Sequence, residues 1–440
     1  MAMVVKNNMS AVSTLNTLNK NQYSLGKSLA KVSSGQRINS AQDDASGFAI
    51  SERMRVMKRA LDQANQNTQN GSALMKVAEG AVSNTVEILK TLKEKAINAA
   101  TDTLTEEDRQ TVQKEIDQFI DQVNDNALAT FNGKYLVDGS KANKTNATSS
   151  VFLNQSLMTD ATATTAFTEL KDRSGNNLNI QNDDTVTVTW VYQGQTKTYS
   201  NTVSSVQDLS SLLSYVSVGY DGQTAVAAAS TSGADTGLGT NSAGTAINTA
   251  NGEPGIRLTV GANGIDNQLT GIAITFTDKD GNNRKAANEF LEFKTAIFAT
   301  NANEDNALKI HTGSQAGQSI SIGLADMRAE ALGLQGSDGS RISVATVKKA
   351  NGAIAAFDSA LQKALDQATT IGAIEARLEY TSNNLVTESE NVQAAESTIR
   401  DADMAKEMTE YTKNNVLLQA AQSMLAQANQ NSSAVLSLLQ

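Results

Sequence analysis

Apolar and small residues between positions 50 and 99 recur at alternating spacings of four and three residues. The positions are Ile50, Met54, Met57, Leu61, Ala64, Thr68, Gly71, Met75, Ala78, Val82, Thr85, Leu89, Leu92, Ala96 and Ala99. This pattern is typical of a long helix that packs along other helices. At 1.5 Å per residue the helix spans roughly 75 Å. Because threonine, glycine and alanine fill many of the positions, the helix needs partner helices from the rest of the chain.

The same spacing precedes this helix. It predicts a first helix that ends before Gly35, a residue suited to the position after a helix C-terminus. Ser40 is predicted to cap the long helix, with Asp43 and Asp44 in its first turn, where carboxylates favour the positive end of the dipole. The apolar residues of the first helix are Leu15, Leu18, Leu25, Leu29 and Val32.

A third helix and a tight turn follow. Thr105 with Asp108 three residues later predicts a helix N-terminus. Its apolar face comprises Val112, Ile116, Phe119, Ile120 and Val123. The Asn132-Gly133 pair that follows Phe131 predicts a hairpin turn.

From about residue 141 the spacing stops, and threonine, serine, asparagine, glycine and alanine dominate. Alternating residues predict a hairpin of 185–192 and 196–203, joined through Gln193-Gly194-Gln195, and strands at 256–260 and 269–277. A short helix is predicted from Val206, Leu209, Leu213 and Val216, and a low-complexity loop over 231–251.

Heptad spacing returns after Ser340 with a shift of phase near Ile371, which local overwinding can absorb. A last helix carries Met404, Met408, Tyr411, Leu418, Leu425, Ala428, Val435 and Leu439. We therefore predict a mainly α rod of long coiled-coil-like helices from both termini, with β-hairpins and an inserted β-rich outer domain. The predicted rod core comprises Ile50, Met54, Met57, Leu61, Leu89, Leu92, Leu378, Leu385, Val392 and Ile399.

Composition narrows the function classes. The 440 residues carry a net charge of −10, which argues against a nucleic-acid binder. Cysteine is absent, so disulfides and thiolate chemistry are excluded, and the single proline, Pro254, leaves both sets of terminal helices unbroken. No apolar run is long enough to span a membrane, and the first fifteen residues do not resemble a secretory signal.

Candidate chemistry is sparse. His311 is the single histidine, so a zinc site of the His-Glu-x-x-His type is excluded, and we expect this side chain on the surface or in a turn. Asp278-Lys279-Asp280-Gly281 is similar to part of a calcium loop, but the later ligands are missing, which predicts a turn. We expect no catalytic, cofactor-binding or metal-binding residues and no enzyme activity. The alternatives from other function classes are an enzyme carried on a coiled-coil stalk and a secreted membrane translocator.

Three stretches of the chain carry distinct motifs. The first runs from Leu29 to Gly47 and includes Ser34-Gly35-Gln36-Arg37-Ile38-Asn39. The second is Gly313 to Gly333. The third comprises Leu425-Ala426-Gln427-Ala428-Asn429-Gln430 and Val435-Leu436-Ser437-Leu438-Leu439-Gln440. Together these stretches resemble the bacterial flagellin family, and the resemblance covers roughly 1–140 and 308–440.

The resemblance implies a structural subunit that self-assembles into the extracellular flagellar filament for swimming. It implies an inner-core helical domain (1–44 and 401–440), a rod domain (45–160 and 306–400) and a variable, surface-exposed β-rich domain (161–305). Self-assembly is expected to use apolar seams on the terminal helices. These seams comprise Leu15, Leu18, Leu25, Leu29, Val32, Leu418, Leu425, Val435, Leu436 and Leu439.

The implied partners are other copies of the chain, an export chaperone at the C-terminal helix, and the filament cap and hook-associated proteins. Export unfolded through the flagellar type III channel follows from the same resemblance. Neither nucleic acid nor membrane is an expected partner. The alternative is a hook–filament junction protein with similar ends, and the closing Leu436-Ser437-Leu438-Leu439 favours the filament subunit.

The resemblance also concerns innate immune recognition. In the family, Toll-like receptor 5 contacts an arginine, a leucine one turn later and a glutamate on the next helix. The matching positions here are Thr91, Lys95 and Glu115. Only Glu115 keeps the side-chain chemistry, so we predict weak activation of this receptor.

Overall fold

The fold is described from a computed structural model of the chain, which covers residues 8–162, 164–204, 207–208, 210–211, 227–229, 236–249 and 252–438. The chain divides into two compact units. The terminal unit comprises Met1–Thr68, His311–Gln318 and Tyr380–Gln440, and the central unit comprises Gln69–Ile310 and Ser319–Glu379.

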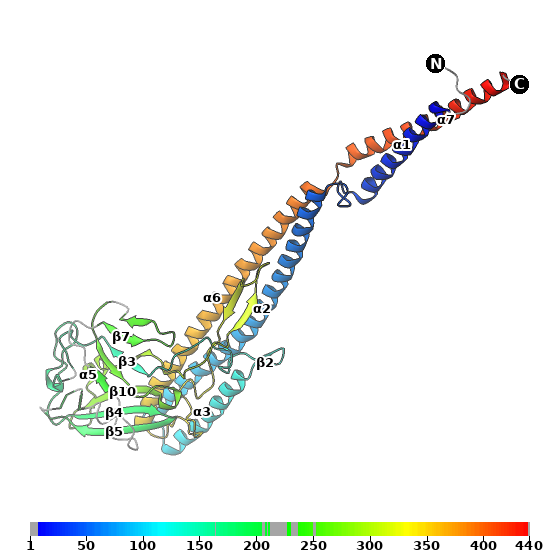
Figure 1. The fold of residues 1–440 in the computed structure, drawn as a ribbon. Helices are drawn as coiled ribbons and strands as arrows, with labels where there is room; N and C mark the ends of the chain where they lie inside the picture. The colour runs from blue at the N-terminus through cyan, green and yellow to red at the C-terminus, as the bar shows by residue number, and fades with distance from the viewer. Residues whose placement is uncertain are drawn as a thin grey trace. The chain divides into compact units, whose positions relative to one another are not determined.

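In the terminal unit, the first and last helices pair along their lengths. Helix α1 (Met9–Ser34) lies beside α7 (Met404–Leu438) (Figure 1). The side chain of Asn8 caps α1 by accepting from the Ala11 amide, and Gly35 ends it with φ 69°, as predicted. A conformation with positive φ favours glycine because no Cβ is present.

The long helix α2 (Ala45–Ala99) begins later than a cap at Ser40 would place its start. The Asp44 carboxylate accepts hydrogen bonds from the amides of Ser46 and Gly47 at 3.0 and 2.9 Å and therefore caps the helix. The prediction that Ser40 caps α2 was wrong. Both the amide and the hydroxyl of Ser40 donate to Asp43, so this carboxylate closes the preceding loop instead.

The terminal unit also contains a contact between the first part of α2 and the last part of α6 (Val347–Arg400). Its small apolar core comprises Leu61, Ala64 and Leu385, with Met57 and Val392 packed at the edge. Hydrogen bonds flank this core. The Ser389 hydroxyl donates to Asp62 at 2.8 Å, and the Ser382 hydroxyl donates to Asn65 at 2.7 Å.

In the central unit, the remaining part of α2 packs with α3 (Glu106–Ala127) and the first part of α6. The Thr105–Asp108 capping box was predicted and is confirmed. All twelve predicted α2 positions from Leu61, in the terminal unit, to Ala99, in the central unit, are buried. The phase shift near Ile371 does not interrupt α6, and this side chain is fully buried.

Most β structure belongs to the central unit and is antiparallel. The predicted Asn132-Gly133 turn joins β1 (Thr130–Phe131) to β2 (Lys134–Tyr135), with φ of 49° and 72°. A second sheet has the order β10 (Leu269–Thr277), β4 (Thr185–Tyr192), β5 (Gln195–Thr202). The predicted 185–203 hairpin is thus confirmed, although Gln195 pairs with Tyr192 and belongs to the strand.

A third sheet has the order β11, β3, β9, β6, and two further pairs are β7–β8 and β12–β13. Strands β7 and β8 correct the prediction of a loop over 231–251. The short helix predicted from Val206, Leu209, Leu213 and Val216 lies outside the described residues. Asp278 forms the predicted turn by accepting from the amides of Asp280 and Asn282. The bounds not yet given are β3 (Val151–Asn154), η1 (Phe167–Glu169), β6 (Ala227–Ala229), β7 (Gly237–Thr240), β8 (Ala246–Asn248), β9 (Ile256–Thr259), η2 (Ile265–Asn267), α5 (Lys285–Phe290), β11 (Lys294–Ile297), β12 (Leu308–His311) and β13 (Ser319–Ile322).

The β-rich part of the chain packs directly on the start of α6. A Cβ added at Gly352 would overlap Thr189 Cγ2, so only glycine allows β4 to approach the helix this closely. The Thr295 and Ser359 hydroxyls are 2.8 Å apart, and the Thr196 hydroxyl donates to the Ser343 carbonyl at 3.2 Å. A separate apolar core behind this contact includes an edge-to-face pair of Phe167 and Phe276, with ring centroids 5.5 Å apart.

Candidate assembly surface

The paired terminal helices leave many large apolar side chains in contact with water. Two helices can bury only the stripe along which they meet, and here Ser28 and Ala421 are the buried residues of the described parts of α1 and α7. The exposed apolar side chains of the pair are Met9, Val12, Leu15, Tyr23 and Leu29 on α1, and Met404, Met408, Val416, Leu417 and Met424 on α7. We call this set the terminal apolar surface.

The predicted seam residues divide between the helix contact and this surface. Leu15 and Leu29 are exposed. The half-buried seam residues are Leu18, Leu25, Val32, Leu418 and Leu425. Val435 and Leu436 lie in α7, but their side chains are not among those described. Leu439 lies outside the described residues.

The ten predicted rod-core residues are all buried or half-buried. Leu61, Leu89, Leu92, Leu378 and Leu385 are buried. The half-buried members are Ile50, Met54, Met57, Val392 and Ile399. His311 ends β12 and is exposed, in agreement with the expected surface position.

Arg400, which the sequence reasoning missed, organises the polar contacts where α6 ends. The residue is buried, with 5% of its surface exposed. Its guanidinium donates to Glu52 Oε1 at 2.6 Å and Gln36 Oε1 at 3.1 Å, and lies 5.3 Å from the Phe48 ring centroid. The hydrogen bond from Arg400 lowers the pKa of Glu52. A cation in the last turn of a helix is the only local signal for this role.

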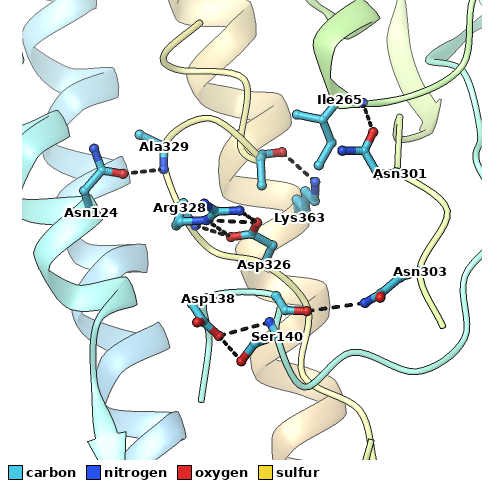
Figure 2. Close-up of polar contacts among 12 residues, drawn as sticks. Asn124, Asp138, Ser140, Ile265, Asn301, Asn303, Asp326, Arg328, Ala329 and Lys363 are labelled. Carbon is cyan, nitrogen blue, oxygen red and sulfur yellow. Dashed lines mark hydrogen bonds and ion pairs between the residues drawn. The ribbon is translucent and has the colours of Figure 1, made fainter. Parts of the chain in front are cut away.

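A second polar cluster, also missed, holds the segment between β13 and α6 (Figure 2). Arg328 Nη2 lies 2.6 Å from Asp326 Oδ2, and the Ala329 amide donates to Asn124 Oδ1 at 2.9 Å. Lys363 Nζ donates to the Ala331 carbonyl at 2.6 Å. This cluster therefore ties one segment to both α3 and α6.

Burial lowers the pKa of Lys363 to about 8, while the Asp326 carboxylate acts in the opposite direction. A lysine with a lowered pKa is a candidate nucleophile in an active site. Here the amine is engaged by a backbone carbonyl and lies 5.8 Å from the Phe298 ring centroid. These contacts hold the segment between β13 and α6 in place.

The three residues matched to the receptor contact lie on α2 and α3. Lys95 Nζ forms an ion pair with Glu115 Oε2 at 2.6 Å. The Thr91 hydroxyl donates to the Glu87 carbonyl, one turn earlier in the same helix, at 3.0 Å. The carboxylate that matches the family pattern is therefore already paired with a lysine of the same chain.

Comparison with known proteins decides the family. The description of the bacterial flagellin N-terminal helical region matches residues 5–142, and that of the C-terminal helical region matches residues 354–439. Flagellin of Clostridium tyrobutyricum is 32% identical over 433 residues, covering 97% of this chain and 99% of its own. The chain belongs to the bacterial flagellin family. It is thus a filament subunit with long terminal helices and antiparallel sheets between them.

A second flagellin, from Bacillus subtilis (strain 168), is 29% identical over 458 residues and covers 99% of this chain and 100% of its own. The hook-associated alternative is weaker because these relatives are named flagellin. Among solved structures, flagellar hook associated protein-3 of Legionella pneumophila is 16% identical, covers 79% of this chain and 98% of its own, and has a TM-score of 0.34. That score is too low to inform the comparison. No helix in the described ranges is both long enough and apolar enough to cross a membrane.

Proposed function

We propose that the terminal apolar surface is where copies of this flagellin bind one another in the filament. The observation that carries the proposal is its exposure on both helices of the pair. Large exposed apolar surfaces mark interaction sites. Its burial between copies would contribute about 25 cal/mol for each Å² removed from water.

Helix α7 supplies the more specific argument. Leu418 and Leu425 are half-buried, whereas Val416, Leu417 and Met424 are exposed, so apolar side chains occupy more than one face. A helix that is apolar on several faces is stable when other helices surround it. One partner, α1, is present in the chain, and neighbouring copies would supply the others.

In this proposal, residues 1–44 and 401–440 form the inner core of the filament, 45–160 and 306–400 the rod, and 161–305 the variable outer domain. The subunit acts as structural material and not as an enzyme. It leaves the cell unfolded through the flagellar type III channel and is extracellular once assembled. An export chaperone holds the C-terminal helix beforehand, and the cap and hook-associated proteins contact the filament ends.

The test replaces two exposed leucines. The double variant Leu15→Ser, Leu29→Ser should remain a folded monomer, because both side chains are already in water, but should fail to sediment as filaments after salt-induced assembly. The control Asn16→Ser, Lys20→Ser changes two exposed polar residues of the same helix and should assemble like the parent chain. Normal assembly of the leucine variant would refute the proposed surface.

Removal of both terminal helices gives a coarser test. Deletion of 1–34 and 404–440 should leave a soluble monomer that forms no filaments. Because short helices in water are marginal without partners, helix content per residue should also rise when the full chain assembles. If circular dichroism gave the same helix content per residue for monomer and filament, the result would argue against ordering of the terminal helices on assembly.

A further inference from the structure

Cysteine is absent, so the eleven methionines carry all the sulfur atoms of this chain. The described methionines differ sharply in exposure. Met9, Met404, Met408 and Met424 are 71%, 42%, 46% and 63% exposed, and all four belong to the terminal apolar surface. Met75 and Met327 of the central unit are 0% and 1% exposed. The half-buried methionines are Met54, Met57 and Met158.

We propose that Met9, Met404, Met408 and Met424 form an oxidation-sensitive site that controls assembly. A peroxide or hypohalous acid would convert them to sulfoxides in the unassembled chain, and the oxidised chain would then fail to join a filament. The inference rests on the proposed function, because it takes the terminal apolar surface to be the contact between copies. It assigns a chemical class of modifier to that surface.

The reaction needs no group from the protein. The thioether sulfur attacks one oxygen of hydrogen peroxide, a sulfur–oxygen bond forms, and the oxygen–oxygen bond breaks. The second oxygen leaves as hydroxide and takes the proton of the transferred oxygen, so the sulfur loses two electrons, a sulfoxide forms, and the peroxide is reduced to water. The rate at each methionine is then set by access of the oxidant to the sulfur, so the exposed residues react first.

The product changes the surface and leaves the monomer fold alone. A sulfoxide oxygen is a strong hydrogen-bond acceptor on a side chain that was apolar. In the monomer this oxygen faces water at all four positions. Between copies, the sulfoxide oxygen would lose its hydrogen bonds to water and face apolar side chains that offer no donor. Burial of the oxidised side chain in the contact is therefore unfavourable.

The position of the methionines concentrates the effect. Met404 and Met408 are four residues apart and share one face of α7, and Met408 lines a groove with Val416 and Leu417. Methionine is otherwise well suited to such a contact, because its flexible side chain adapts to a partner surface. Oxidation removes this advantage from both helices of the pair at once. We expect the protein concentration needed for assembly to rise at least about tenfold.

The experiment oxidises the full-length monomer with hydrogen peroxide, removes the peroxide with catalase, and maps sulfoxides by mass spectrometry. The four exposed methionines should react before Met75 and Met327. Circular dichroism should stay unchanged while sedimentable filament is lost. Treatment of the same sample with the two methionine sulfoxide reductases should restore assembly. In filaments assembled before treatment, the four methionines should be protected.

Variants separate these four methionines from the others. The quadruple variant Met9→Leu, Met404→Leu, Met408→Leu, Met424→Leu should assemble after peroxide treatment. The control Met54→Leu, Met57→Leu, Met158→Leu should remain as sensitive as the parent. Met1 and Met3 lie outside the described residues and are present in both variants, so their oxidation cannot explain a difference.

The outcomes distinguish the two proposals. Normal assembly of parent chain that carries sulfoxide at all four positions would overturn the inference and leave the proposed function standing. Undiminished peroxide sensitivity of the quadruple variant, or failure of the reductases to rescue the oxidised parent, would also overturn it. Failure of the untreated parent to assemble would contradict the proposed function itself.

Discussion

Arg400 and Glu52, 348 residues apart in the chain, form an ion pair in which guanidinium Nη1 and carboxylate Oε1 are 2.6 Å apart. The same guanidinium donates to Gln36 and lies over the Phe48 ring, so one side chain joins the end of α6 to residues on both sides of the start of α2. Because Arg400 is 5% exposed while Glu52 is partly solvated, most of the cost of breaking the pair should come from the arginine side.

Replacement of this arginine should therefore destabilise the terminal unit. We expect Arg400→Leu to lower the free energy of unfolding by about 2 kcal/mol, through lost charged hydrogen bonds and lost packing. Urea denaturation of the monomer measures the change. Arg53→Leu, at an exposed position of α2, is the control and should change stability by less than about 0.5 kcal/mol. Equal effects of the two substitutions would show that the Arg400 contacts contribute little.

The pair should also respond to acid. The hydrogen bond from Arg400 lowers the folded-state pKa of Glu52, so its contribution is complete above the unfolded pKa of 4.5 and is lost as the pH falls through the lower folded value. Glu52→Gln should remove this part of the acid sensitivity. Thermal melting between pH 3 and pH 6 would show it as a flatter pH dependence than that of the parent.

Two glycines of α6 should respond to alanine in opposite directions. Gly352→Ala should destabilise the central unit by about 1–3 kcal/mol, because the added methyl group overlaps Thr189 of β4. Gly372→Ala should stabilise it by up to about 1 kcal/mol, because nothing lies within 4 Å and alanine favours the helix. The melting temperatures of the two variants should lie on opposite sides of the parent value, and changes of the same sign would refute this packing.

Lys363 should make the stability of the central unit rise with pH. Its pKa is about 8 in the folded chain and 10.5 ordinarily, so between these values the unfolded chain binds more protons and a rise in pH favours folding. Arg328, Asp326, Glu330 and Asp138 are the charged groups around the cluster. We expect a gain of about 2 kcal/mol from pH 8 to pH 10.

The control for this gain is a second lysine of α6. Lys363→Met should abolish the rise, whereas Lys348→Met, at an exposed position, should retain it. Urea denaturation at several pH values measures both variants. A parent stability that does not change from pH 8 to pH 10 would be inconsistent with a lowered pKa of Lys363.

The Lys95–Glu115 ion pair supports the prediction that this chain activates Toll-like receptor 5 only weakly. In the match to the family, Lys95 stands in the place of the leucine, and its ammonium group forms an ion pair with the matched glutamate, Glu115. The double variant Thr91→Arg, Lys95→Leu should release Glu115 and signal more strongly, by roughly thirtyfold in potency for about 2 kcal/mol of binding free energy. A reporter-cell assay of the monomers tests this. Strong signalling by the parent, or no gain in the variant, would refute it.

The sequence by itself determined the long helices, the hairpin turns and most of the ends of these helices. These features depend on local chemistry: the heptad spacing of Leu61 to Ala99, the Thr105–Asp108 box, Gly35 with positive φ, and Asn132-Gly133. Each signal lies within a few residues of the element it specifies. The exception, the start of α2, failed because neighbouring serine and aspartate residues compete for the same cap.

Only the tertiary structure decided which distant residues meet. Segments that carry no local signal for one another meet in the strand order β11–β3–β9–β6 and where Thr189 packs on Gly352. The same is true of the hydrogen-bond partners of Arg400 and Lys363. The same holds for exposure on the terminal helices. The heptad pattern assigns both Leu15 and Leu18 to the apolar seam and does not distinguish them. Because one partner helix covers a single stripe, Leu18 is half-buried and Leu15 remains in water.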